Sequence, residues 1–400
     1  MWDSKFKEAL PILERIESFG YQAFFVGGAV RNQLLAIPIT DVDIATSAPP
    51  TAIQEIFPKV IPVGIEHGTV IVRHNHESFE VTTFRLEGTY SDKRHPDRVT
   101  FIADLDLDLS RRDFTMNALA MDRLGSVYDP FNGQNDIRNK MIRTVGNPND
   151  RFMEDPLRII RAFRFVSQLG FFIEEETLSA VLSSIEWIDS LAVERLANEL
   201  EKLFRGDYCR VAIRLCSELN LWRRLPVFNK IDDVSSLLAN INSPLVGLYE
   251  VFAYIKLNNP AVQIKEIVRE WKQSNHTFHT TKQLVESVEL YMKSGLTPWL
   301  VYQLPSELYH SFIRLVEVTL GEQINENQLQ QTEKELPIKN KKMIDFSGHD
   351  LIKLYPNRVK GPWVQRYLNE IESAIVTKKL TNNYIEIKEW VHTCHPPENA

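Results

Sequence analysis

Two glycines followed by a pair of aspartates are the residues of this sequence best suited to chemistry. Gly27, Gly28 and Arg31 follow an apolar run, and 12 residues separate Gly28 from the pair Asp41 and Asp43. Glycine has no Cβ, so backbone N–H groups at such a turn can approach a phosphate closely. Carboxylates at alternate positions of a strand point to one face, and a divalent cation is the usual way to hold them together. Oxygen ligands alone favour Mg²⁺ over zinc.

Each of these features also occurs without a catalytic role, the glycine pair as a plain turn and D-x-D as a solvated strand end. Together they resemble the signature of the DNA polymerase beta-type nucleotidyltransferases. The pattern of that family calls for a third carboxylate on a neighbouring strand. Glu80, between Phe79 and Val81, fits such a strand, and an outward-facing strand glutamate is the alternative.

Four further motifs are similar to those of the class II tRNA nucleotidyltransferases, the family of CCA-adding enzymes. They are residues 111–119 (RRDFTMNAL), residues 128–133 (YDPFNG), residues 154–161 (EDPLRIIR), and Glu194-Arg195 with Glu199. Less specific similarity returns at residues 347–351 (SGHDL) and 361–363 (GPW). Asn32 stands where the family usually has aspartate, so that position keeps a hydrogen-bonding oxygen and loses a metal-ligand role.

The resemblance implies that the protein adds and repairs the 3′-terminal CCA of tRNA without a nucleic-acid template. The implied substrates are the tRNA 3′ end, CTP and ATP, and pyrophosphate is released. Two Mg²⁺ ions would activate the 3′-hydroxyl and stabilise the leaving oxygens. The metal ligands would be Asp41 and Asp43, with Glu80 as the third carboxylate, and the groups that grip the triphosphate would be Gly28, Arg31 and Arg112.

Base selection would fall to Asp155 and Arg158. We expect both on a helix that opens near Pro156, where the i,i+3 spacing gives them a common face. Aspartate accepts a hydrogen bond from the exocyclic amine of cytosine or adenine, and arginine donates to the acceptor beside it; uracil and guanine reverse this pattern. An ordinary ion pair is the alternative. Arg161 and Arg164 continue the basic face, either towards the nucleotide or as a solvated stripe.

The stretch Glu87–Pro96 is a candidate for the element that switches the pocket from C to A. It is polar, carries Gly88 and lies between two strand signals, a setting typical of functional loops. A passive hairpin connection is the alternative. Relatives that add only CC lack part of a flexible loop in the head, so this stretch favours the complete activity.

Other functions compete with this interpretation. A bacterial poly(A) polymerase shares the head motifs, but residues 63–70 (VGIEHGTV) look like the CCA-adding version; a partial CC-adding or A-adding enzyme is a further alternative. A phosphohydrolase of the H…HD…D type is suggested by His349-Asp350, but no aspartate follows Asp350 to complete its ligands. A non-catalytic RNA-binding protein is disfavoured by the joint presence of the charged motif residues.

The secondary structure expected to position these residues changes along the chain from mixed helices and strands to helices alone. A helix is expected near Lys5–Phe19, and short strands near Ala23–Val26, Val42–Ala45, Thr69–Val72, Phe79–Phe84 and Arg98–Ile102. After residue 146 the apolar spacing becomes helical. We therefore expect an α/β head with a mixed sheet (1–145), followed by an all-helical neck (146–210), body (211–315) and tail (316–400). The tail is the expected tRNA-binding part.

Composition sets limits on partners and location. The net charge of −7 argues against a protein that coats nucleic acid with its whole surface, although residues 138–164 and two lysine-rich segments of the tail are locally basic. The N-terminus has no apolar signal core, and no stretch has the ~18 apolar residues of a membrane span. Three cysteines without a C-x-x-C pair fit a reducing cytoplasm. The sequence leaves monomer and homodimer open.

Overall fold

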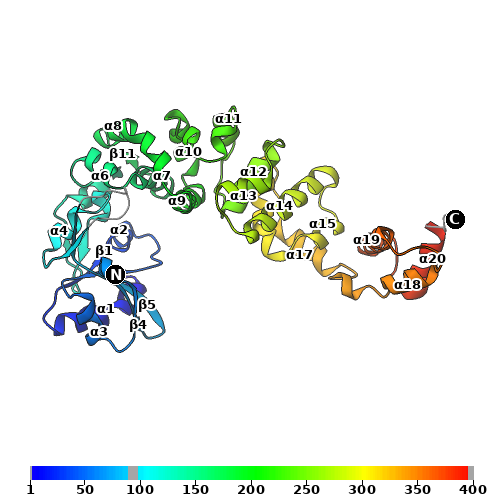
Figure 1. Cartoon of the computed structure of the whole chain (residues 1–400), viewed down its shortest axis with the longest axis horizontal. Coiled ribbons are helices and arrows are strands. Elements are labelled where there is room, and N and C mark those ends of the chain that lie inside the picture. The colour runs from blue at the N-terminus through cyan, green and yellow to red at the C-terminus, as the bar shows by residue number, and fades with distance from the viewer. Residues whose placement is uncertain (1, 89–97, 395–400) are drawn as a thin grey trace. The chain divides into compact units, whose positions relative to one another are not determined.

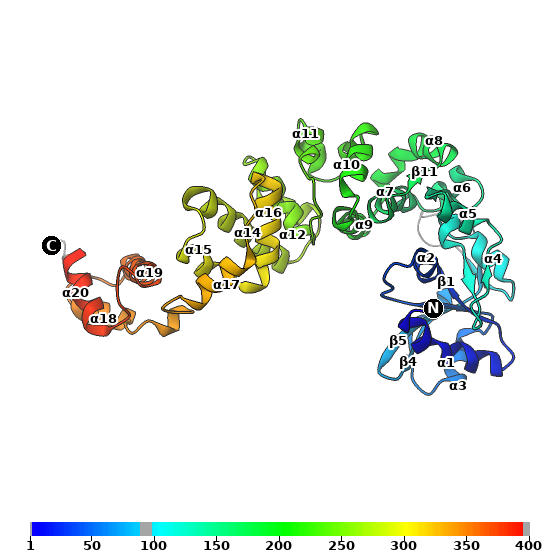
Figure 2. The same cartoon turned by 180° about the vertical axis from the view of Figure 1, so that it is seen from behind.

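The computed structural model describes residues 2–88 and 98–394 of the chain (Figure 1). Contacts between residues divide the chain into two compact units, Met1–Ser235 and Ser236–Ala400. Seen from behind, the first unit contains strands and helices, and the second contains helices (Figure 2). This order, a sheet-containing part followed by helices, confirms the predicted fold class.

The first unit is built around a seven-stranded mixed sheet of order β3-β4-β5-β2-β1-β8-β9. Strand β1 pairs antiparallel with β2 and β8, whereas β2 pairs parallel with β5. Its strands are β1 (Ala23–Val26), β2 (Asp43–Thr46), β3 (Val60–Gly64), β4 (Thr69–His74), β5 (Glu77–Thr83), β8 (Ala120–Met121) and β9 (Val127–Tyr128). Two small ribbons pair β6 (Arg85–Glu87) with β7 (Val99–Phe101) and β10 (Met141–Ile142) with β11 (Phe172–Ile173). Each predicted strand segment overlaps an observed strand.

One face of the sheet is covered by α1 (Ser4–Ser18). Asp3 caps this helix by accepting a hydrogen bond from the Lys5 backbone N–H, and the helix ends just before Gly20, which has φ 86°. The buried ring of Phe6 meets that of Phe25 edge-on, with centroids 4.8 Å apart. This contact fixes the strand that leads into the glycine turn.

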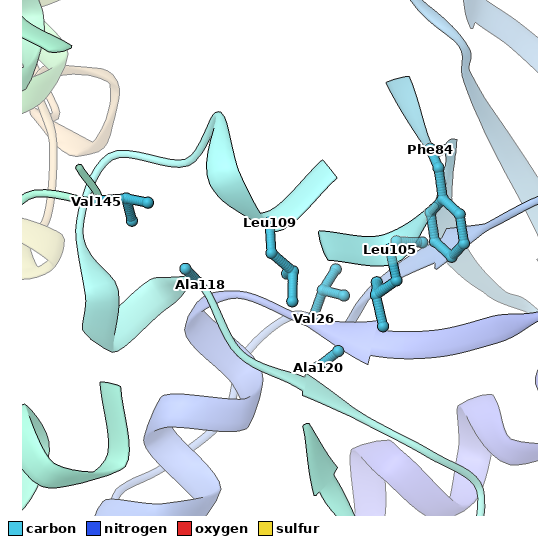
Figure 3. Close-up of a cluster of buried hydrophobic side chains, with 8 residues drawn as sticks. Val26, Phe84, Leu105, Leu109, Ala118, Ala120 and Val145 are labelled. Carbon is cyan, nitrogen blue, oxygen red and sulfur yellow. The ribbon is translucent and has the colours of Figure 1, made fainter. Parts of the chain in front are cut away.

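A buried apolar cluster supports the turn from the opposite side (Figure 3). It joins Val26 at the end of β1 to Leu109 of α4 (Leu105–Ser110) and to Ala118, and its other members are Ala45, Phe84, Leu105, Ala120 and Val145. Because these side chains come from separate segments, the cluster holds the end of β1 against the segment that carries residues 111–119.

The helical part of the first unit is centred on two neighbouring helices, α7 (Leu157–Leu169) and α9 (Val193–Arg205). The Ser167 hydroxyl donates to the Leu203 carbonyl at 2.5 Å, so the helices approach closely at that level. The remaining helices are α2 (Gly28–Leu35), α3 (Pro50–Ile56), α5 (Gly133–Arg138), α6 (Pro148–Glu154), α8 (Glu175–Ser184) and α10 (Cys209–Glu218), and α11 (Val234–Ala239) spans the division between the units.

The described part of the second unit consists of helices and their connections, without a strand. The longer helices after α11 are α12 (Leu248–Asn258), α13 (Ile264–Glu270), α14 (Asn275–Ser294), α15 (Pro298–Gln303), α16 (Tyr309–Leu320), α17 (Glu326–Lys334), α18 (Gly348–Leu354), α19 (Pro362–Val376) and α20 (Tyr384–Cys394). Helices α12, α14 and α16 pack around one core. Within it Glu250, 0% exposed, accepts from the Arg314 guanidinium at 2.5 and 3.1 Å.

The helices described are each too short or too polar to cross a membrane. The contacts divide the chain once, between residues 235 and 236, and do not separate the predicted neck from the head or the predicted tail from the body. The four-part division at 145, 210 and 315 therefore stays a prediction.

Candidate active site

The glycine turn joins β1 to α2 and leaves room for an arginine. Gly27 has φ 72°, a left-handed conformation that favours glycine. A Cβ at Gly27 would lie 3.0 Å from Nη1 of Arg112, so the guanidinium rests directly against the backbone of the turn. The predicted strand–Gly-Gly–helix arrangement is therefore present, with Gly28 as the first residue of α2.

The three predicted carboxylates come from the neighbouring interior strands β2 and β5 and from the segment before β2. Asp43 is the first residue of β2, and Glu80 of β5 is its register partner in the parallel pair. Asp41 lies before the strand, exposed, and accepts a hydrogen bond from the Thr40 hydroxyl at 3.0 Å. Over the described residues, no three or more His, Cys, Asp or Glu side chains form a preassembled metal site.

The charges of these carboxylates affect one another. Loss of hydration in the cleft raises the pKa of Asp43, the Arg112 guanidinium lowers it, and the Asp41 carboxylate raises it again, with a net upward shift. Loss of hydration and the charge of Asp43 likewise raise the pKa of Glu80, against the opposite effect of Arg85. The cluster thus carries mutual repulsion that a cation would relieve.

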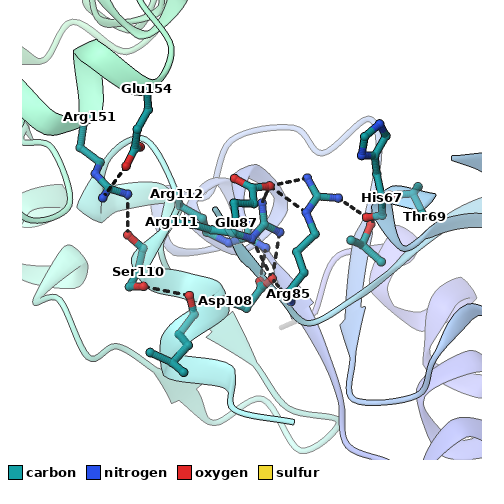
Figure 4. Close-up of polar contacts among 12 residues, drawn as sticks. His67, Thr69, Arg85, Glu87, Asp108, Ser110, Arg111, Arg112, Arg151 and Glu154 are labelled. Atoms are coloured by element: carbon teal, nitrogen blue, oxygen red, sulfur yellow. Dashed lines mark hydrogen bonds and ion pairs between the residues drawn. The ribbon is translucent and has the colours of Figure 1, made fainter. Parts of the chain in front are cut away.

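A buried aspartate, Asp108 of α4, anchors the arginines of the second motif (Figure 4). Asp108 is 1% exposed, and its Oδ1 accepts from Arg111 Nε and Nη2 at 3.1 and 2.8 Å. Its Oδ2 accepts from Arg112 Nη2 at 3.4 Å. Glu87 binds Arg111 at 3.0 Å and Arg85 at 2.7 Å. The sequence predictions did not include Asp108, although the D-x-D-x-D run at 104–108 offered a signal.

Arg112 makes fewer hydrogen bonds to Asp108 than Arg111 does. The Nε of Arg112 is buried and has no hydrogen-bond partner among the described residues. Burial lowers the pKa of the guanidinium, Asp108 raises it and Arg111 lowers it, with a net downward shift. The neighbouring carboxylate of Asp113 is bound by Arg161.

Asp113 connects the neck helix α7 to the glycine turn through a chain of side chains. Its Oδ2 accepts from Arg161 Nε and Nη2 at 2.8 and 2.6 Å, and its Oδ1 accepts from the Asn117 amide at 3.0 Å. Asn117 in turn accepts a hydrogen bond from Arg31. Burial raises the pKa of Asp113, but Arg161 and Asn117 outweigh it and hold the pKa well below its ordinary value. Arg31 also donates to Asn32 at 2.8 Å, which agrees with the supporting role expected of that asparagine.

Three guanidinium groups surround the ring of Phe165 on α7. Arg164, Arg31 and Arg161 place their Cζ atoms 4.1, 5.0 and 5.8 Å from the ring centroid. Burial and mutual repulsion lower the pKa of Arg31 and of Arg164 to about 10. Glu199 of α9 offsets part of this charge through a 3.2 Å contact with Arg164. All three arginines stay protonated at neutral pH.

The expectation that Asp155 and Arg158 share a helix face is wrong. Asp155 precedes the helix with φ −146° and ψ 98°, because α7 begins only after Pro156 and a residue before proline is disfavoured in helical conformation. Its carboxylate accepts from Arg195 at 2.7 and 3.2 Å and from the Leu157 backbone at 3.1 Å.

Arg158 has partners of its own. It donates to Glu154 at 2.6 Å and to the backbone carbonyls of Arg151 and Arg111 at 3.0 and 2.9 Å. The two side chains are thus held separately, but both line the same cavity.

That cavity has a volume of about 580 Å³ and collects the predicted nucleotide-binding residues and both aspartates, whereas Glu80 is not in its wall. Eight of its described lining side chains are basic and five are acidic, so it suits a polyanion. Lining residues that the predictions omitted are Gly27, Thr40, Glu87, Arg111, Asp113, Asn117, Leu157, Phe165, Gln168, Arg195 and Lys202.

One further predicted segment lies apart from the cavity. His349-Asp350 stands at the start of α18, where Asp350 and Ser347 form a capping box, an architectural role in place of a hydrolase motif. Of the stretch Glu87–Pro96, Glu87 lines the cavity, and residues 89–96 lie outside the described residues.

Comparisons with family models divide the chain into three matched regions. Residues 23–143 match the poly A polymerase head domain, and residues 170–232 match the probable RNA and SrmB- binding site of polymerase A. Residues 251–391 match the putative tRNA nucleotidyltransferase domain 2.

Full-length relatives identify the family. The CCA-adding enzyme of Oceanobacillus iheyensis is 46% identical over 400 residues that cover all of both chains, and that of Staphylococcus saprophyticus is 39% identical over 98% of this chain and all of the relative. Among solved structures, the Bacillus stearothermophilus CCA-adding enzyme in complex with CTP matches with a TM-score of 0.87 and 34% identity over 98% of each chain. The Thermotoga maritima CCA-adding enzyme complexed with tRNA shares the fold, with a TM-score of 0.64 and 20% identity over 98% of this chain and 96% of that one. The chain therefore belongs to the class II CCA-adding enzymes, the nucleotidyltransferases that add CCA to the 3′ end of tRNA.

Proposed function

We propose that the cavity between the glycine turn and α7 is the single site at which CMP and AMP are transferred to the tRNA 3′ end. The observation that carries this proposal is the convergence of two aspartates, a cluster of arginines and the pair Asp155 and Arg158 around one volume of about 580 Å³. A cavity of this size accommodates one nucleoside triphosphate.

Divalent metal use is general among the polymerase-beta-type nucleotidyltransferases. We propose Mg²⁺ held by Asp41 and Asp43, with Glu80 as a neighbouring carboxylate, because all three offer oxygen ligands and their charges repel in its absence. Bound Mg²⁺ would supply activation of the 3′-hydroxyl and neutralisation of the leaving oxygens.

The triphosphate would lie along the glycine turn. Gly28 would present its backbone N–H at the start of α2, and Arg112 would add a charged donor whose Nε is otherwise unsatisfied. Arg31, Arg161 and Arg164 would contribute positive charge from the Phe165 cluster. Arginine suits this role because its planar fork binds phosphate oxygens in pairs.

The base would be read by Asp155 and Arg158, which would bind the amine and acceptor edge shared by cytosine and adenine. Asp155 is held by Arg195, so the carboxylate is already oriented before a nucleotide arrives. A base with the reverse pattern would leave buried polar groups unpaired, at a cost of about 1–3 kcal/mol each.

The proposed assignment of roles extends to the whole chain. In the proposed division, residues 1–145 carry catalysis, 146–210 read the base, 211–315 form the body, and 316–400 hold tRNA. The three cysteines, all free, suit a reducing cytoplasm.

The test uses tRNA that lacks CCA, Mg²⁺ and each labelled nucleotide in turn. We expect incorporation of C and then A, and rejection of U and G. The variants Asp41→Asn and Asp43→Asn should lose at least about 10³-fold in incorporation of both bases, as expected when metal ligands are removed, with tRNA binding unchanged. Asp207→Asn, an exposed aspartate outside the cavity, is the matched control. Substantial activity in either active-site variant would remove the metal assignment.

A further inference from the structure

A second cavity, of about 510 Å³, lies within the second unit. Its walls come from α14, α15, α19 and the short 3-10 helix η7 (Lys341–Met343). None of its lining residues belongs to the proposed active site, whose lining residues all lie in the first unit.

One wall is aromatic and rigidly held. The rings of Trp299 and Tyr302 on α15 stack with centroids 5.6 Å apart and an interplanar angle of 21°. The Tyr302 hydroxyl donates to Glu372 of α19 at 2.6 Å, which fixes the ring on which Trp299 rests. Trp299 itself is partly exposed and lines the cavity. A preordered indole of this kind is a stacking platform for a flat ligand.

The acidic group behind this wall is neutralised within the protein. Glu372 is 2% exposed, and its second oxygen lies 3.1 Å from the Lys341 ammonium. Glu286, the other acidic lining residue, lies 3.5 Å from Lys282. The carboxylates of the lining are therefore each paired with a lysine.

The rim, by contrast, is basic. Lys339 lines the cavity, and Lys342 follows on the exposed turn of η7. The Asn340 side chain accepts from the Lys342 backbone N–H at 3.0 Å, which fixes the turn that carries these lysines. An aromatic wall beside a basic rim suits a ligand with a flat ring at one end and negative charge at the other.

We propose that this cavity binds an unpaired nucleobase of the tRNA substrate. The base would stack on Trp299, and the adjoining phosphates would meet Lys339 and Lys342. Proteins recognise RNA by splayed bases stacked on aromatic side chains, with basic residues along the backbone, and both elements are present. The proposal rests on the proposed function, in which tRNA is the substrate. It adds a tRNA contact that lies far in sequence from the residues proposed to transfer the nucleotide.

The experiment measures the Kd of the full-length protein for tRNA lacking CCA, over a range of salt concentrations. Trp299→Ala should raise Kd by about tenfold, the loss expected for one stacked base, and Trp299→Phe should restore most of the affinity. Lys339→Ala should lower the slope of log Kd against log salt by about 0.7–1. At saturating tRNA, kcat and the KM for CTP should match the wild type.

The matched control is Tyr384→Ala, an exposed ring that contacts Phe346 at a tilt in the same unit and lies outside the cavity. Wild-type Kd in both Trp299→Ala and Lys339→Ala, or an equal loss in Tyr384→Ala, would overturn the proposal. Trp299→Phe and the exposed Lys339→Ala keep the test decisive if the alanine variant of Trp299 does not fold. The proposed transfer site is judged separately, because Asp43→Asn should bind tRNA normally and lose only turnover.

Discussion

The carboxyl group of Asp43 lies in the wall of the active-site cavity beside Arg112 and Asp41, and it is register partner to Glu80. Loss of hydration and the charge of Asp41 raise its pKa, and Arg112 only partly opposes them. The folded protein without metal therefore disfavours the ionised form that a metal ligand needs. In the metal site proposed above, a bound cation would offset this cost of ionising Asp43.

This leads to a prediction about stability. Without divalent metal at pH 7, Asp43→Asn should melt about 1 °C higher than the wild type, while inactive. A carboxyl whose pKa is raised on folding stabilises the fold in acid and loses that contribution as the pH rises above its ordinary value of 3.8. The gain should therefore vanish near pH 4, and Mg²⁺ should stabilise only the wild type. Thermal melts at both pH values measure this; a lower Tm for the variant at pH 7 without metal would contradict it.

A second residue-scale prediction concerns Arg195, which we regard as a positioning residue for Asp155. Because Arg195 holds the Asp155 carboxylate at 2.7 Å, Arg195→Ala should leave that carboxylate free to rotate. The ratio of kcat/KM for CTP to that for UTP should fall by about tenfold, because this corresponds to the free energy of roughly one hydrogen bond to a charged group. Arg195→Lys should recover part of this selectivity.

The control for Arg195 lies on the same helix. Lys202 also lines the cavity, but the Asp155 carboxylate is held by Arg195 and the Leu157 backbone N–H, so Lys202→Ala should leave base selectivity unchanged. Unaltered selectivity in a folded Arg195→Ala variant would show that Asp155 is oriented without it. Asp155→Ala provides the reference for complete loss of the carboxylate.

At the level of elements, the sequence predicts the helix α7 and its start near Pro156 well, but not the conformation of Asp155. The spacing of Leu157, Ile160 and Phe163 gives one buried face, and all three are buried. Asp155 was wrongly placed on the helix, although the proline after it was a visible signal against that. The pairing of Asp155 with Arg195, 40 residues away, could not be read from local spacing.

For the sheet, too, local sequence patterns predict the elements but not how they pair over long distances in sequence. The glycine turn and the strands β1, β2 and β5 follow from local patterns of β-branched and aromatic residues. Strand order does not, so the register between Asp43 and Glu80 was an expectation from family resemblance alone. The anchoring role of Asp108 depends on the fold that brings α4 to β6, and composition does not reveal it.

The packing of α7 against α9 gives an element-scale prediction. A Cβ at Gly206 would lie 2.2 Å from the Ser167 hydroxyl and 2.4 Å from its carbonyl oxygen, closer than any real contact. Gly206→Ala should therefore cost about 2–4 kcal/mol of unfolding free energy and weaken CTP binding, because both helices carry lining residues of the cavity.

Chemical denaturation and CTP titration check this prediction. Gly64→Ala is the matched control, since nothing lies within 4 Å of its added Cβ and its φ of −169° suits any residue. Its cost should stay within about 0.5 kcal/mol. Equal stability of the Gly206 variant and the control would show that α7 and α9 can separate freely.

At the scale of the whole molecule, the residues that line the active-site cavity all fall between Gly27 and Lys202, within the first compact unit. A fragment of residues 1–233, which stops before α11, should bind CTP within about threefold of the wild-type Kd and should bind tRNA at least tenfold more weakly. Calorimetry with CTP and filter binding with tRNA give the two values. If the folded fragment bound tRNA with wild-type affinity, the second unit would not contribute to substrate binding.

The unequal sharing of Asp108 has a consequence for how the enzyme meets its substrate. Arg111 holds this carboxylate by two short contacts, whereas Arg112 reaches it by one contact of 3.4 Å. An incoming phosphate can therefore draw Arg112 away while Asp108 keeps a full counter-charge. With the triphosphate contact proposed for Arg112, substrate capture would exchange one anion for another around this guanidinium, and Asp108 would keep its pairing with Arg111. The release of pyrophosphate can follow the same route in reverse, so each of three successive additions returns the site to its starting state.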